Sequence, residues 1–412
     1  MFSSQLLIDI LHENFLRPLH IGSIQYNPIW VPKVENLTVY RGTPYYAPQH
    51  TVDEGYNAVT GNLFFSHEEP LEKSDLEDFQ TWGSLEESQF GRHGIPSAND
   101  IWSYGIQILA NSEISQVKRQ FIRKYKMLDW YFFYHGFAAL DWFRDFKYFS
   151  INPNPSFSHL FISYNHLVTA KRSYRLFLLA NLLNKNLDRV GLISAPAVND
   201  RKIWFNELYS NRPSQLNADA KKLIYTEFNK LDKGFILDKT EVCGLLSTNI
   251  NLELNAKAFL QVVTETVFFD KKLHLTEKIF KPIVSRQPFM LVAAPGNLAY
   301  LKSYGFKTFS DWWDESYDNE EDDNKRISMI TEELEKLSKL SMSQLRDMHR
   351  EMSDVLDYNR EHFYNNFKKH IVHELVDNFE KCINIHNFDL SERFRIPLNL
   401  LDLPAIKKRL LQ

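Results

Sequence analysis

Short apolar segments alternate with helix-like segments along the second half of this chain, and this alternation constrains the fold more than any other feature. His159–Tyr164, Ala258–Phe269 and Pro288–Ala294 are rich in apolar and β-branched residues, as buried strands are. Between them lie Arg172–Asn184, with apolar residues at helical spacing, and Thr276–Val284, which opens on a good N-cap. Because strands separated by helices pair in parallel, the sequence predicts an α/β fold with a parallel sheet.

A proline- and asparagine-rich stretch, residues 150–158, precedes this alternating part. Two prolines and two asparagines in nine residues break any regular element, so we expect a domain boundary here. A chain of 412 residues also suits two domains of ordinary size. The sequence thus predicts one domain over 1–150, a second over 156–385 that ends in long helices, and a tail over 386–412 that packs back on the body.

Composition argues against several classes of protein. The net charge of −4 lacks the basic excess typical of nucleic-acid binders. The two cysteines, Cys243 and Cys382, are too few for a disulfide framework and suit a reducing compartment. We find neither a basic, apolar leader nor an apolar run of about 20 residues, so we expect a cytoplasmic protein without a membrane span. Dinucleotide, P-loop and zinc motifs are missing, so we expect no metal and no cofactor.

The sharpest local signal is Thr276-Glu277-Lys278 at the start of a predicted helix. The free N–H groups of a helix start favour a phosphate, and Lys278 adds a full positive charge. Glu277 has the acceptor oxygens that a ribose diol needs. An ordinary capped surface helix explains the same residues, so spacing alone leaves both interpretations open.

A second signal lies beyond the predicted strand that ends at Tyr164-Asn165. Ligands in open α/β sheets bind beyond the carboxyl ends of strands, and arginine clamps phosphate with two parallel hydrogen bonds. Arg172 and Arg175 stand where such contacts are expected. A solvated basic helix start is the alternative interpretation.

A third signal follows an apolar strand in the first half of the chain. His67-Glu68-Glu69 comes directly after Asn62–Ser66, and a carboxylate at a strand end can act as the general base for an acceptor hydroxyl. A solvated turn accounts for the same letters, and His135, among aromatic residues, fits a packed core as well as a cleft.

Together these segments resemble a known family. Glu265-Thr266-Val267-Phe268, then Leu275-Thr276-Glu277-Lys278-Ile279-Phe280 and Gln287-Pro288-Phe289, are similar to the donor-site motif of the α-1,3-fucosyltransferases. That resemblance implies the GT-B fold, in which two Rossmann-like domains face each other across a cleft. It also implies an inverting, metal-independent sugar transfer from a nucleotide-diphosphate sugar to the hydroxyl of a glycan or other acceptor. The stretch from Gly305 to Asp311 and the helices after it also resemble viral glycosyltransferase-like proteins.

The resemblance assigns roles residue by residue. It implies that Glu277 holds the ribose, that Lys278 binds the diphosphate, and that either Arg172 or Arg175 binds phosphate. Glu68 is then the candidate base, with Glu69 as its close rival. The expected donor-binding set is Arg172, Arg175, Glu265, His274, Thr276, Glu277 and Lys278.

The chain departs from the family motif at two places. His274 stands where the family has a tyrosine, and Thr266-Val267 follow Glu265 in place of Asn-Ser. The departure at His274 favours one alternative, a non-catalytic GT-B-like protein that binds a nucleotide or a partner. Two further alternatives to the glycosyltransferase stay open, a DNA-base glycosyltransferase of the phage type and an interaction protein built on the helices after Arg326.

Overall fold

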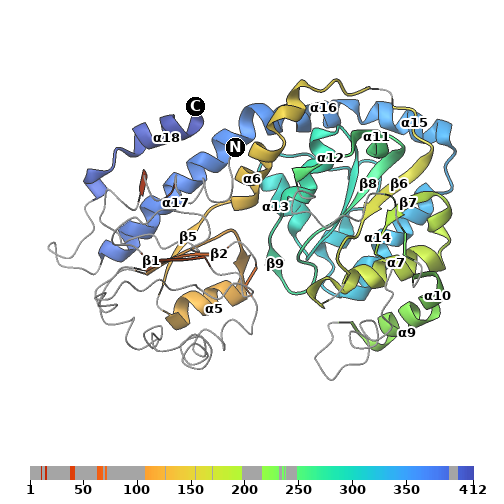
Figure 1. Ribbon diagram of the computed structural model, residues 1–412, viewed down its shortest axis with the longest axis horizontal. Helices are drawn as coiled ribbons and strands as arrows, with labels where there is room; N and C mark the ends of the chain where they lie inside the picture. The colour runs from red at the N-terminus through yellow and green to blue at the C-terminus, as the bar shows by residue number, and fades with distance from the viewer. Residues whose placement is uncertain are drawn as a thin grey trace. The chain divides into compact units, whose positions relative to one another are not determined.

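The computed structural model describes residues 11, 14–15, 38–41, 63–67, 70–71, 107–125, 127–153, 155–168, 170–196, 216–231, 234–235, 237, 248–388 and 398–412. They form an α/β protein, as the alternation of elements predicted, and it contains two four-stranded parallel sheets (Figure 1). The chain divides into two compact units. The first combines Met1–Ala138 with Lys368–Gln412, and the second is Ala139–Phe367.

Unit 1 is built on a four-stranded sheet whose strands follow one another in chain order, β1-β2-β3-β5. All neighbouring strands are parallel, and His67 at the end of β2 pairs with Asn111 at the end of β3. The elements of this unit are β1 Thr38–Arg41, β2 Leu63–His67, β3 Gln107–Asn111, β4 Ile114–Ser115, α5 Gln116–Tyr125, β5 Leu128–Tyr131, the first part of α6 Tyr134–Trp142, α17 Lys368–Phe388, a 3₁₀ turn Leu398–Leu400 and α18 Leu403–Leu411.

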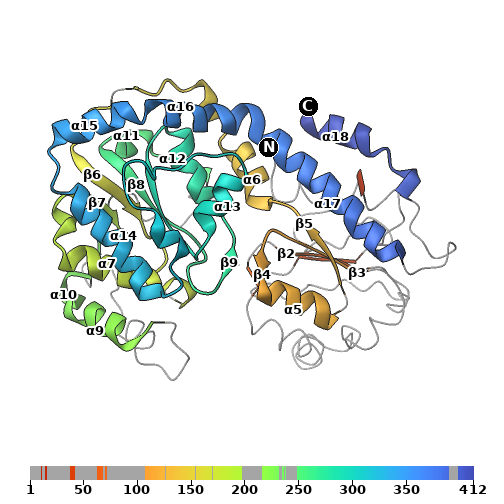
Figure 2. The same ribbon diagram turned by 180° about the vertical axis from the view of Figure 1, so that it is seen from behind.

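The long helix α17 returns to unit 1 and packs against β5 (Figure 2). The indole N–H of Trp130 donates to the carbonyl of Leu375 at 3.0 Å. The Trp130 ring lies 4.6 Å from Phe379 and 5.3 Å from Phe15, measured between centroids. This aromatic cluster joins the beginning, the middle and the end of the chain in one core. α18 contacts α17, and Lys407 of α18 pairs with Asp377 of α17 at 2.5 Å.

Unit 2 contains the second parallel sheet, in the order β10-β8-β6-β7. Its central strand β8 is buried at every residue, which suits its run of apolar and β-branched side chains. The elements are η4 Arg144–Tyr148, β6 His159–Tyr164, η5 Ala170–Arg172, α7 Tyr174–Asn184, η6 Leu187–Arg189, β7 Gly191–Ser194, α9 Ala218–Thr226, α10 Phe228–Leu231, α11 Leu252–Asn255, β8 Ala258–Thr264, β9 Lys272–Leu273, η8 Glu277–Ile279, α12 Phe280–Val284, β10 Phe289–Val292, α13 Asn297–Ser303, η9 Ser316–Asn319, α14 Asp323–Leu337, α15 Met342–Glu351, α16 Ser353–His362 and a π-helical turn Phe363–Phe367.

Helices cover both faces of this sheet. The crossover from β6 through α7 to β7 and the crossover from β8 through α12 to β10 run in opposite directions along the sheet. Because such crossovers are right-handed, their helices lie on opposite faces. α7 packs against α14, and α12 packs against α16. Ten residues of α7 are buried, so this helix belongs to the core rather than to a solvated surface.

Element boundaries differ from the sequence prediction in three places. β8 ends at Thr264 rather than near Phe269, because the next residues leave the sheet to form a hydrogen-bonded loop. The helix expected over Thr276–Val284 is a 3₁₀ turn followed by the five-residue α12. The chain passes from one compact unit to the other after Ala138 and again after Phe367, whereas the linker pattern placed the boundary near residue 150.

Candidate functional site

The strand order of the second sheet reverses direction between β6 and β8. From β6 the chain moves to β7 on one side, and it then returns past β6 to β8 and β10 on the other side. At such a point the loops that leave the carboxyl ends of the two strands diverge, and ligands bind in the crevice between them. The loop after β6 leads to Arg172 and Arg175, and the loop after β8 leads to Thr276-Glu277-Lys278. The topology therefore brings the two expected donor-binding segments to one edge of one sheet.

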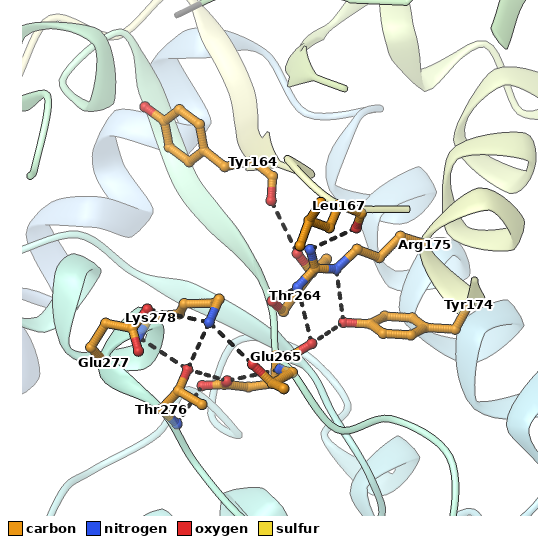
Figure 3. Close-up of polar contacts among 10 residues, drawn as sticks. Tyr164, Leu167, Tyr174, Arg175, Thr264, Glu265, Thr276, Glu277 and Lys278 are labelled. Carbon is orange, nitrogen blue, oxygen red and sulfur yellow. Dashed lines mark hydrogen bonds and ion pairs between the residues drawn. The ribbon is translucent and has the colours of Figure 1, made fainter. Parts of the chain in front are cut away.

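The carboxylate of Glu265 fixes the loop after β8. Its side chain is fully buried, directly beyond the last residue of the strand. One oxygen accepts from the backbone N–H of Thr276 at 3.2 Å (Figure 3). The other oxygen accepts from the Thr276 hydroxyl at 2.5 Å and from the Thr266 N–H at 3.2 Å. Glu265 thus holds the turn that carries Lys278, and these contacts give it a positioning role.

The ammonium group of Lys278 lies above this turn and keeps access to solvent. Its Nζ lies 3.1 Å from the hydroxyl of Thr276, 3.3 Å from that of Thr266 and 3.3 Å from a carboxylate oxygen of Glu277. The Lys278 side chain is 31% exposed, whereas that of Glu277 is 6% exposed. The neighbours therefore orient the cation without enclosing it, so it remains available to an anionic ligand.

The short helix after this turn limits what backbone dipoles add. Thr276 caps it as predicted, because its side-chain oxygen accepts from the Lys278 N–H at 3.4 Å. The helical run is one 3₁₀ turn and the five-residue α12. Since a helix dipole grows with the number of aligned peptide units, we expect the charge of Lys278 to dominate the local field.

Arg175 has a structural environment rather than an open one. Its guanidinium donates to the carbonyls of Leu167 at 2.9 Å, Thr264 at 2.8 Å and Glu265 at 3.1 Å (Figure 3). Its Nε donates to the hydroxyl of Tyr174 at 3.3 Å. The residue is 3% exposed. Arg175 therefore ties the loop after β6 to the end of β8 and has most of its donors occupied.

Tyr174 completes this tie between the two loops. Its hydroxyl donates to the carbonyl of Glu265, and its ring stacks on Phe268 at a centroid distance of 4.4 Å. Burial raises the pKa of Tyr174 above its ordinary value, so the phenol stays protonated as a donor. A side chain that the sequence did not single out thus supports both candidate segments.

Arg172 contrasts with Arg175. It ends the 3₁₀ turn η5 just before α7 and is only partly buried. It makes no hydrogen bond or ion pair with another residue of the described ranges. The sequence left these two arginines as equal candidates for phosphate binding. Their environments now favour Arg172 as the one whose charge is open to a ligand.

His274 was expected to bind the donor, and its side chain is closed to a ligand. The side chain of His274 is buried at 1% exposure, and its backbone N–H donates to the side chain of Asn297 at 2.9 Å. A ring buried in this way has no open face on which a base could stack.

The N-terminus of α13 is not open to a ligand, because the Asp318 carboxylate accepts from the N–H groups of Leu298 at 2.9 Å and Ala299 at 3.1 Å. Asp318 fills the place that an anionic ligand would take there.

The candidate bases Glu68 and Glu69 lie outside the described residues. The strand before them, β2, ends at His67 beside Asn111 of β3. The backbone N–H of Leu71, just after them, donates to the carboxylate of Glu113 at 2.5 Å. Glu113 is fully buried and also accepts from the hydroxyl of Ser115. This carboxylate therefore anchors the chain directly after the acidic segment.

A buried lysine lies close to this anchor. Lys118 donates to the carbonyl of Asn111 at 3.0 Å and pairs with Asp129 at 2.7 Å. Burial lowers the pKa of Lys118, and the charges of Asp129 and Glu113 oppose that shift. The sequence analysis assigned no role to this strand end. The signal was the change from apolar Ile108-Leu109-Ala110 to polar Asn111-Ser112-Glu113 at a strand end.

No family model, curated protein or solved structure matches this chain. Among the residues that the structure describes, no three His, Cys, Asp or Glu side chains gather as ligands of a metal ion do. Within the same residues, no helix combines the length and the apolar character that a membrane crossing needs.

Proposed function

We propose that this protein is a glycosyltransferase of the GT-B type that transfers a sugar from a nucleotide-diphosphate sugar to an acceptor hydroxyl. One observation carries the proposal. Lys278, a partly exposed cation, extends from a turn that the buried carboxylate of Glu265 holds in place. This turn lies at the point where the strand order of a parallel sheet reverses. Arg172 lies beyond the neighbouring strand with no partner among the described residues. Two such cations suit a diphosphate.

The proposed chemistry is a direct displacement that inverts the anomeric carbon and needs no metal ion. Glu68, or its neighbour Glu69, removes the proton from the acceptor hydroxyl as that oxygen attacks the anomeric carbon. The bond from that carbon to the diphosphate breaks, and the diphosphate leaves with the bonding electrons. Lys278 and Arg172 stabilise the charge that develops on the leaving group. The resemblance to the α-1,3-fucosyltransferases supports this assignment.

A thermal-shift experiment with nucleotides and nucleotide sugars tests the donor site. A ligand present at about 100 times its Kd stabilises the folded state by about 2.7 kcal/mol, enough to raise Tm by several degrees. We expect GDP, UDP or a related diphosphate to produce this shift in the native protein. Lys278→Ala should abolish the shift, whereas Lys302→Ala, which removes an exposed lysine of α13 in the same unit, should preserve it. A full shift in Lys278→Ala would remove Lys278 from the site.

Glu68→Gln and Glu69→Gln separate binding from transfer. The amide cannot accept the acceptor proton, so the variant of the true base should bind the nucleotide normally and lose turnover by at least a hundredfold. Transfer is measured with the nucleotide sugar that gives the largest thermal shift. Normal binding without turnover in the native protein would instead favour a non-catalytic nucleotide-binding protein. The absence of any nucleotide response would reject the proposal.

A further inference from the structure

All three protons of the Lys278 ammonium have an acceptor in the structure. Its Nζ lies 3.1 Å from the hydroxyl oxygen of Thr276, 3.3 Å from that of Thr266 and 3.3 Å from a carboxylate oxygen of Glu277 (Figure 3). An ammonium group has three donors and no acceptor, so these contacts use its full capacity. An anionic ligand that binds Lys278 must therefore displace one of the three acceptors.

The two hydroxyl groups are neutral acceptors that the turn holds in place. The Thr276 oxygen also accepts from the backbone N–H of Lys278 at 3.4 Å, so its two lone pairs are occupied. Its proton is then directed to the carboxylate of Glu265, 2.5 Å away. Thr276 is 1% exposed and Thr266 is 4% exposed. We therefore expect both hydroxyl contacts to persist when a ligand binds.

Glu277 differs from the hydroxyl groups in its charge. Its carboxylate competes directly with an anionic ligand for the ammonium of Lys278. The Glu277 side chain is only 6% exposed, whereas that of Lys278 is 31% exposed. A carboxylate shielded from water costs free energy unless donors replace that water. A phosphate that draws the ammonium away thus deprives Glu277 of this donor and places a second negative charge beside it.

We propose that Glu277 is a specificity-determining residue, through which the donor site rejects inorganic phosphates and accepts nucleotides. When a nucleoside diphosphate binds, the ammonium of Lys278 turns to the diphosphate, and the ribose hydroxyls donate to Glu277 in its place. Inorganic pyrophosphate offers the same diphosphate group but brings no hydroxyl groups, so the loss at Glu277 is not compensated. This inference rests on the proposed donor site. It adds rejection of bare phosphates to the ribose contact that the family resemblance implies.

Isothermal titration calorimetry of the full chain with inorganic pyrophosphate, GDP and UDP tests this role. Glu277→Gln keeps the shape of the side chain and removes its charge, so we expect it to bind pyrophosphate at least tenfold more tightly than the native protein does. Its affinity for the preferred nucleotide should not rise, because the amide accepts more weakly from the ribose. Glu335→Gln is the matched control. It removes a carboxylate from another ion pair of the unit, with Lys185 at 2.6 Å, and should keep both native affinities.

Two further variants show whether the gain acts through Lys278. Adding Glu277→Gln to Lys278→Ala should bring no gain in pyrophosphate affinity, because no ammonium is left to release. Glu277→Ala removes the carboxylate without a polar replacement and should also strengthen pyrophosphate binding. It provides a second reading of the same effect if the amide variant does not fold.

An unchanged or weaker affinity for pyrophosphate in Glu277→Gln would overturn the proposal. An equal gain in the Lys278→Ala background would overturn it as well, because the effect would then be one of general charge. Failure of the proposed function has a different signature. In that case the native protein binds no nucleotide, and a gain in pyrophosphate affinity in Glu277→Gln would still support the competition of Glu277 for Lys278.

Discussion

At the residue scale, Arg172 and Arg175 show how two similar side chains divide between support and ligand binding. They are three residues apart, and the sequence offers no means to rank them. Arg175 turns into the protein, where backbone carbonyls of two loops occupy its donors. Those carbonyls become available only when β6 and β8 lie side by side, which is a tertiary property. The different roles of the two arginines therefore follow from the fold and not from their local sequence.

Paired substitutions separate these roles. Arg175→Met removes the guanidinium that donates to the carbonyls of Leu167, Thr264 and Glu265, so we expect the free energy of unfolding to fall by about 3 kcal/mol. Arg172→Met removes no internal contact among the described residues and should change stability by less than about 0.5 kcal/mol. The same Arg172 variant should weaken nucleotide binding about tenfold, through loss of one charged hydrogen bond. Chemical denaturation and the thermal-shift assay measure the two effects, and the reverse pattern would exchange the assignments.

At the element scale, the sequence predicted strands better than helix starts and loops. β6 spans His159–Tyr164 as expected, because a continuous apolar run between polar residues has few other uses. The predicted end of β8 was wrong by several residues, since Val267, Phe268 and Phe269 are apolar for a different reason. They pack in the loop, where Phe268 stacks on Tyr174 and lies beneath the guanidinium of Arg326. Apolar pattern alone does not distinguish a buried strand from a buried loop.

In the candidate site, too, local features were predictable from the sequence and long-range contacts were not. Thr276 and Lys278 were predictable, because a cap and a cation at the start of a helical turn are local signals. Glu265 was expected only as a donor-binding residue, from the family resemblance, and neither its contacts with Thr276 nor the contribution of Tyr174 was expected. These contacts join residues 91 and 11 positions apart. No periodicity in a single sequence encodes such long-range pairs.

Helix α15 gives the element scale a prediction about pH. His349 attaches this helix to Phe157 and Phe259, and its pKa is lowered from 6.5 to about 4, mainly by burial. The unfolded chain therefore binds a proton as the pH falls below about 6.5, while the folded protein resists protonation until about pH 4. Stability from this residue is fully present above about pH 6.5 and is lost as the pH falls, by at most about 3 kcal/mol.

Denaturant titrations between pH 4 and pH 7 measure this effect. His349→Phe keeps a ring against Phe157 and Phe259 and removes the titrating group, so its stability should depend less on pH over this interval. His166→Phe changes an exposed histidine and should keep the native pH dependence. Identical pH profiles for the native protein and His349→Phe would show that His349 titrates normally in the folded state.

At the scale of the whole molecule, the ends of the chain are part of the first core. The two units are each compact, yet unit 1 is completed by residues after Phe367. α17 supplies a buried face that includes Ile371, Leu375 and Phe379, and it covers β5. The sequence predicted long helices here as part of a second domain over 156–385, because an apolar helical face does not show which sheet it covers. Unit 1 therefore cannot complete its core until the last helices have been synthesised.

Phe379→Ala tests this dependence on α17. The Phe379 ring is fully buried and lies 4.6 Å from Trp130 and 4.8 Å from Phe15, so its removal opens a cavity beside these two aromatic rings. We expect unit 1 to lose about 3–5 kcal/mol of stability, while unit 2 unfolds as before. Calorimetry with limited proteolysis follows the units separately. Phe388→Ala, at the exposed end of the same helix, is the matched control and should change neither transition. Equal destabilisation of both units by Phe379→Ala would mean that they unfold as one cooperative body and that α17 is not specific to unit 1.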